Sequence, residues 1–96
     1  MTQPNLTPRL HAAVAAEMRH VRAELEKLAE IFVSDVHLAA NYLEQLQAFD
    51  LLIQHTDESA ALLDRLSDGA TPHDAVAPIR LEAVQGRLIA ALSEAA

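Results

Sequence analysis

The apolar residues of the first third of the chain recur in alternating steps of four and three positions. This heptad spacing is typical of a helix that packs lengthwise against another helix. Just before it, Thr7-Pro8 has the form of an N-cap residue followed by proline at the first helical position. We therefore expect a helix from about Pro8 to Val33. The apolar residues of this repeat are Val14, Met18, Val21, Leu25, Leu28 and Phe32.

A second run with the same spacing occupies the middle of the chain. Ser34 or Asp35 can cap its start, because a short side-chain oxygen accepts hydrogen bonds from free N–H groups. We expect one long helix over residues 35–67, whose weak point is residues 55–59, where a new helix could begin. Together the two helices predict a long antiparallel hairpin over residues 8–67. The second repeat comprises Tyr42, Leu46, Phe49, Ile53, Thr56, Ala60 and Leu63.

A boundary follows the second run. Gly69 suits the position just after a helix end, and Thr71-Pro72 has the form of a second N-cap and first-turn proline. We expect a C-terminal helix over residues 72–95, with a short lead-in and a main span of about 78–92. One hairpin leaves half of each apolar seam exposed, so we expect two copies to dimerise into a four-helix bundle. The C-terminal helix could pack on its own hairpin, close the bundle or bind a partner.

The composition favours an all-α protein with a single helical domain over residues 1–96. Two glycines and four prolines are too few for a fold with many turns. The formal charge of −7 argues against nucleic acid or an anionic membrane as the main partner. The absence of cysteine excludes disulfides and thiol catalysis. With no apolar run of transmembrane length and no signal-peptide pattern at the N-terminus, we expect a cytoplasmic protein.

One polar pair stands beside the second apolar seam, in the stretch LQAFDLLIQ over residues 46–54. Asp50 and Gln54 are one turn apart, so both can address the same partner. A glutamine amide can hold a water in line for attack on a phosphoryl group, and a carboxylate can pair with a lysine. With the lysine and the metal supplied by another protein, the pair would complete a site in trans. In a hairpin that turns at Ser34, Met18 to His20 should face Asp50.

This stretch resembles the signature of CheZ-type chemotaxis phosphatases, which has the form QDFQDLTGQ. The match lies in Asp50 and Gln54 with the preceding Leu46-Gln47, and Phe49 stands close to the family's own aromatic residue. The chain departs from the signature at Ala48-Phe49, and at Ile53, where the family often has glycine. In length the chain is nearer to the short CheT type.

The resemblance implies a long helical hairpin that dimerises into a four-helix bundle, with a separate terminal helix that helps to bind a CheY-like response regulator. It also implies that Gln54 orients the water that hydrolyses the regulator's aspartyl phosphate, while Asp50 pairs with the regulator's active-site lysine. The protein would then need no cofactor of its own, because the Mg²⁺ would belong to the regulator.

Other functions remain open at this point. A non-catalytic helical adaptor or dimerisation module would need the hairpin but not Gln54. Histidine phosphotransfer through His20 would fit a helical hairpin, although the flanking motifs of such domains are missing. A metal site is not indicated, because His37, His55 and His73 lack the spacing of ligands in helical bundles. A Ser-His-Asp triad has no elbow motif to support it.

Overall fold

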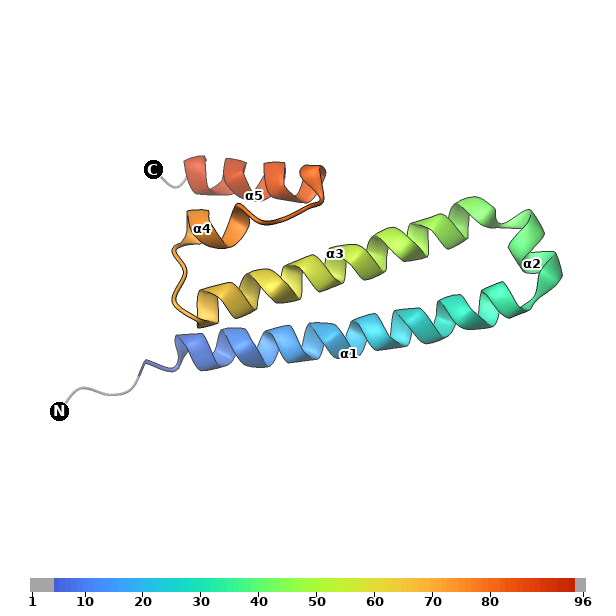
Figure 1. Cartoon of the computed structure of the whole chain (residues 1–96), viewed down its shortest axis with the longest axis horizontal. Coiled ribbons are helices and arrows are strands. Elements are labelled where there is room, and N and C mark those ends of the chain that lie inside the picture. The colour runs from blue at the N-terminus through green and yellow to red at the C-terminus, as the bar shows by residue number, and fades with distance from the viewer. Residues whose placement is uncertain (1–4, 95–96) are drawn as a thin grey trace.

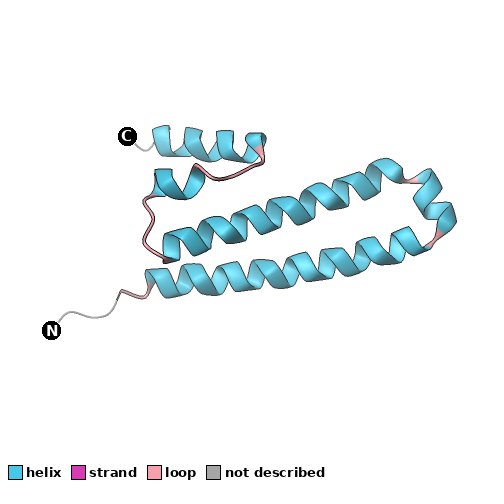
Figure 2. Cartoon of the chain, viewed as in Figure 1, coloured by secondary structure: helices cyan, strands magenta, loops and turns pink. Residues whose placement is uncertain are grey.

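A computed structural model describes residues 5–94 of the chain, and within this range it contains helices and no strand (Figure 2). The two longest helices, α1 and α3, run antiparallel, and α2 crosses the closed end between them (Figure 1). The short helices α4 and α5 lie on the side of α3 that faces away from α1 (Figure 1). The elongated molecule measures 62 × 29 × 17 Å. The helices are α1 (Thr7–Ser34), α2 (Val36–Asn41), α3 (Leu43–Ser67), α4 (Pro72–Val76) and α5 (Glu82–Glu94).

The first helix matches its expected span, but its cap differs. The helix begins at Thr7, one residue earlier than expected, so the assignment of Thr7 as N-cap is wrong. The backbone N–H of Thr7 donates to Asn5 Oδ1 at 3.0 Å, so Asn5 satisfies this free donor. Pro8 still lies in the first turn, where its missing N–H costs no helical hydrogen bond.

The single helix expected over residues 35–67 is divided at Tyr42. Asp35 does cap the first piece, because its Oδ1 accepts the Leu38 N–H at 3.1 Å. At the other end of α2, the Asn41 side chain donates to the His37 carbonyl at 2.8 Å, which offers that backbone group an alternative partner. Tyr42 then leaves helical geometry, with φ −126° and ψ 37°. In contrast, α3 continues without interruption through residues 55–59.

The break at Tyr42 moves the turn of the hairpin along the chain. Because α2 forms the closed end, Phe32 at the end of α1 packs against Phe49, with ring centroids 5.6 Å apart. Asp50 follows Phe49 directly and therefore lies opposite the last turn of α1. The expectation that Met18 to His20 face Asp50 is thus wrong, since it assumed a turn at Ser34.

The seam between α1 and α3 also differs from the expected repeat. Ala15 is buried, and Met18, Leu25 and Phe32 are half-buried, as expected of the inward face. Small Ala15 allows the two helices to approach, and Arg22, seven residues later, reaches across to α3. The seam therefore passes through Ala15 and Arg22, on one side of the expected line. The other members of the repeat are exposed: Val14, Val21 and Leu28.

The end of α3 has the geometry that its sequence predicts. Gly69 has φ 101°, a conformation that L side chains rarely adopt. The Ala70 N–H donates to the Arg65 carbonyl at 2.9 Å and the Gly69 N–H to the Leu66 carbonyl at 3.1 Å, which is a Schellman motif. Two residues later, Thr71 caps α4 by accepting the Asp74 N–H at 3.2 Å. This tight turn folds the C-terminal segment back along α3.

The C-terminal segment is not one continuous helix over residues 72–95: the expected short lead-in from Pro72 is α4, and the expected main span is α5. The second of them begins at Glu82, later than the expected start near Pro78, and residue 95 lies outside the described range. The link between them contains Pro78, which has no N–H for a helical hydrogen bond, and Ile79 in the same link is buried at 4% exposure. The segment packs on its own hairpin through a small apolar cluster: Val76, Ile79 and Val84, with Leu62, Leu81, Leu88 and Leu92 against it.

The two glycines of the chain provide a matched test of these helix assignments. Gly69→Ala should lower the free energy of unfolding by about 1–2 kcal/mol, because a side chain is strained at positive φ. Gly86→Ala should raise it by about 0.5–1 kcal/mol, because Gly86 lies inside α5 with open space around a Cβ atom. Urea unfolding followed by circular dichroism measures both changes, and equal effects would contradict the assignments.

Candidate functional site

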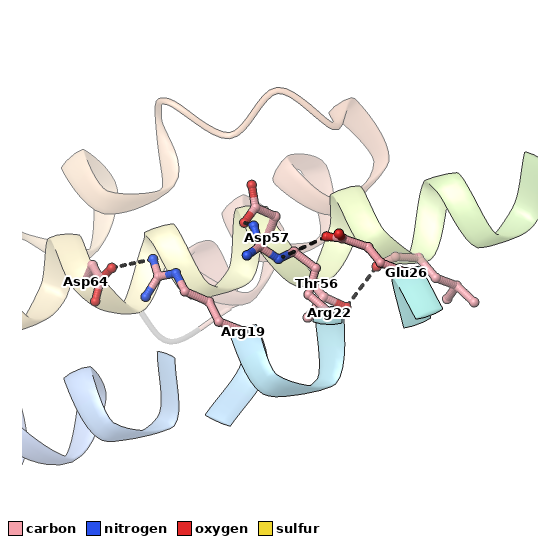
Figure 3. A network of polar contacts seen from close by, with 7 residues as sticks. Arg19, Arg22, Glu26, Thr56, Asp57 and Asp64 are labelled. Atoms are coloured by element: carbon pink, nitrogen blue, oxygen red, sulfur yellow. Dashed lines mark hydrogen bonds and ion pairs between the residues drawn. The ribbon is translucent and has the colours of Figure 1, made fainter. Parts of the chain in front are cut away.

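Three aspartates follow one edge of α3 at seven-residue intervals: Asp50, Asp57 and Asp64. This spacing places them on the same side of the helix. Two of them are paired with arginines of α1 (Figure 3). Arg22 Nη1 lies 3.0 Å from Asp57 Oδ1, and Arg19 Nη2 lies 2.5 Å from Asp64 Oδ2. The aspartate row therefore runs along the edge where α3 meets α1.

Asp50 differs from the other two aspartates because α1 offers it no cation. Seven residues after Arg22, at the next equivalent position, α1 has Ala29. Lys27, the next basic residue after Arg22, has its Nζ 3.3 Å from Glu24 of its own helix. Within residues 5–94, the Asp50 carboxylate has neither a hydrogen bond nor an ion pair. It is thus the carboxylate of the row that is available to an incoming cation.

Gln54 lies one turn after Asp50 on the same uninterrupted helix. Both side chains are exposed, and within the described residues the Gln54 amide also has no hydrogen-bond partner. Residues four apart share a helix face, so the carboxylate and the amide can contact one partner together. The structure therefore keeps the two predicted site residues adjacent, accessible and free of competing contacts.

An ion pair with one buried partner, Glu58, follows one further turn along α3. Glu58 is buried at 6% exposure beneath the link between α4 and α5. Its Oε1 accepts from Arg80 Nε at 2.9 Å, while the Arg80 side chain is 79% exposed. Arg80 therefore helps to hold the C-terminal segment on the hairpin and places a positive charge about one helical turn, roughly 6 Å along the axis, beyond Gln54. The sequence shows both residues but not their pairing, which depends on the Schellman turn.

The arginines of this region differ in how many hydrogen bonds their guanidinium nitrogens make. Arg22 Nε approaches Glu26 at 3.4 Å, but this contact lacks hydrogen-bond geometry (Figure 3). Arg65 Nε donates to the Ala75 carbonyl at 2.8 Å and thereby ties α4 to α3. Ion pairs of this partly exposed kind contribute only about 0–1 kcal/mol each. They orient the helices more than they stabilise them.

The remaining candidate residues do not come together. His20 is exposed on α1, and His37 of α2 lies near Asn41 at 3.2 Å. Over residues 5–94, no three side chains of the types His, Cys, Asp and Glu gather to form a metal site. Over the same residues, none of the helices has the length and apolar character needed to cross a membrane.

Comparisons with known proteins leave the family open. No family model matches the chain, and no curated protein or solved structure matches it at a significant level. Any functional assignment therefore depends on the chemistry of the Asp50–Gln54 site and on its surroundings.

The Glu58–Arg80 pair should show an asymmetric response to substitution. Arg80→Ala should destabilise the fold by about 1–3 kcal/mol, because it leaves the buried Glu58 carboxylate without its donor. Adding Glu58→Gln to that variant should restore most of the loss, since a neutral amide is less costly to bury. Urea unfolding of the single and double variants gives the comparison. A double variant as unstable as Arg80→Ala would contradict this view of the pair.

Proposed function

We propose that this protein dephosphorylates the aspartyl phosphate of a CheY-like response regulator in chemotaxis signalling. The observation that supports it best is the state of Asp50, which is the aspartate of the row left unpaired, with exposed Gln54 one turn away. A site that acts on a partner protein needs both side chains to be free of hydrogen bonds and ion pairs within their own chain. The resemblance of residues 46–54 to the CheZ-type signature supports the same reading.

The chemistry divides between the two proteins. The Gln54 amide hydrogen-bonds a water and holds it in line with the phosphorus atom of the regulator's phosphoryl group. The water oxygen forms a bond to phosphorus as the bond from phosphorus to the aspartyl oxygen breaks. Inorganic phosphate leaves with the water oxygen and both water protons, one of which it can release to solvent, and the regulator's carboxylate is restored. Asp50 pairs with the regulator's lysine and aligns the two proteins, while the Mg²⁺ stays with the regulator.

The proposal includes a homodimer that forms a four-helix bundle. Val14, Val21 and Leu28 are exposed along α1 at seven-residue spacing, and Val21 is 54% exposed. Val21 lies two residues after Arg19, which turns it about 200° away from the Asp64 side. A second hairpin that covers this stripe would bury apolar surface and leave Asp50 and Gln54 free. The stripe thus supports a dimer with two outward-facing sites.

A non-catalytic adaptor is the alternative. The same apolar stripe would serve a dimerisation module equally well, and none of its residues takes part in chemistry. The two functions differ in what they require of Gln54. An adaptor that binds a signalling protein through the aspartate row would retain its binding when the amide is removed.

Gln54→Ala should slow regulator dephosphorylation about 100-fold, since a water out of line loses most of its reactivity. The assay is phosphate release from a phosphorylated CheY-like regulator with Mg²⁺, alone and with each variant. Glu17→Ala is the control, because Glu17 is exposed on α1 and lies outside residues 46–54. Asp50→Asn should raise the concentration needed for half-maximal rate. Equal rates for Gln54→Ala and the unaltered protein would favour the adaptor.

The dimer proposal is tested by Val21→Glu. Two buried glutamates at the same interface would lack partners, so the variant should sediment as a monomer where the unaltered protein is dimeric. Val36→Glu provides the control, because Val36 is 83% exposed on α2 and lies outside the stripe. Analytical ultracentrifugation separates the species. A dimer that survives Val21→Glu and dissociates with Val36→Glu would place the interface at the closed end instead.

A further inference from the structure

The closed end of the hairpin contains an apolar pocket. All three aromatic residues of the chain line it, although they come from different helices and from the break between α2 and α3. Its volume is about 360 Å³, which is within the range of pockets that accept a small molecule or a large side chain. The lining residues are Phe32, Leu38, Tyr42, Gln45, Leu46 and Phe49.

Exposed aliphatic side chains lie close to this pocket in the chain, on each of the three helices that meet there. Val36 on α2 is 83% exposed, and Ile31 on α1 is 62% exposed. Val33 at the end of α1 and Leu43 at the start of α3 are exposed as well. Single exposed apolar residues are common, but a group of them beside an apolar pocket is typical of a binding surface.

The charged side chains of this region are acidic. We define the hairpin tip as residues 28–52, the last two turns of α1 through the first part of α3. It contains no lysine or arginine, since every lysine and arginine of the chain lies at or before Lys27 or at and after Arg65, and its one histidine is His37. Acidic residues are present in each part of it. They are Glu30, Asp35, Glu44 and Asp50, and all four are exposed.

We infer that the hairpin tip docks a cationic, amphipathic segment of a partner protein, which inserts an apolar side chain into the aromatic pocket. Lysines or arginines that flank the inserted side chain would face the tip's carboxylates. A second tip is a poor occupant because it carries the same charge, and an anionic membrane would be repelled. This surface shares Asp50 with the proposed phosphatase site but does not include Gln54, so the inference goes beyond the proposed function and does not depend on it.

A synthetic helix provides the probe. It has about 14 residues, with leucines and one tryptophan on one face and lysines on the other, and its counterpart has every lysine replaced by glutamate. The peptides are titrated into the full-length ¹⁵N-labelled protein. The cationic peptide should shift the amide resonances of the pocket residues and bind at least about tenfold more tightly than its counterpart. Added NaCl should weaken this binding.

Charge variants of the protein test the surface directly. Glu30→Lys should weaken binding of the cationic peptide several-fold without harm to α1, because Glu30 is exposed near the C-terminal end of the helix, which favours a cation. Glu44→Lys should weaken it as well. Glu17→Lys is the matched control, since it makes the same charge change on an exposed position of α1 far from the tip. Leu38→Trp, which fills the pocket, should reduce binding of both peptides, and circular dichroism checks that helicity is retained.

Several results would overturn the inference. Equal affinity for the two peptides would show a pocket without charge selectivity, and no binding of either would show no docking site. Shifts centred on Val14, Val21 and Leu28 would move the site to the apolar stripe. Concentration-dependent shifts at the pocket without peptide would identify a second copy as the occupant. Because Gln54→Ala should leave peptide binding intact, failure here is distinguishable from failure of the proposed phosphatase activity.

Discussion

The register between α1 and α3 is the constraint on which the rest of the structure depends. It is defined at one end by the ring contact of Phe32 with Phe49 and further along by the pair of Arg22 with Asp57. A shift of one turn in this register would break both contacts at once. It would also change which aspartate meets an arginine, so the open state of Asp50 is a consequence of the register.

The heptad spacing predicts the long helices well, because apolar residues that recur every three or four positions are sufficient to identify a packed helix. The break at Tyr42 could not be predicted in the same way, since Tyr42 itself continues the apolar repeat. The choice of seam also escapes the pattern. The inner line of α1 passes through Ala15 and Arg22, and the charged Arg22 interrupts the apolar spacing although it pairs across the interface with Asp57.

The candidate site was only partly predictable. Asp50 and Gln54 are recognisable because residues four apart on a helix act together, and this needs no tertiary information. The seven-residue spacing of the aspartate row is visible in the sequence. Which of these aspartates pair with an arginine is not, because the pairing depends on how α1 and α3 pack. The Glu58–Arg80 pair is similar, because the residues are 22 positions apart and a glycine-dependent turn brings them together.

The hairpin has one apolar surface and two acidic ones, and each would suit a different kind of partner. No large side chain is fully buried among residues 5–94, so the isolated chain leaves much apolar surface in water. The apolar stripe of Val14, Val21 and Leu28 lies away from the aspartate row, and the hairpin tip lies at the end of both. Contacts on the stripe would therefore add stability through burial. Contacts at Asp50 and at the tip would instead select a partner through charge. The three surfaces share only the residues at the borders of the tip, Asp50 and Leu28.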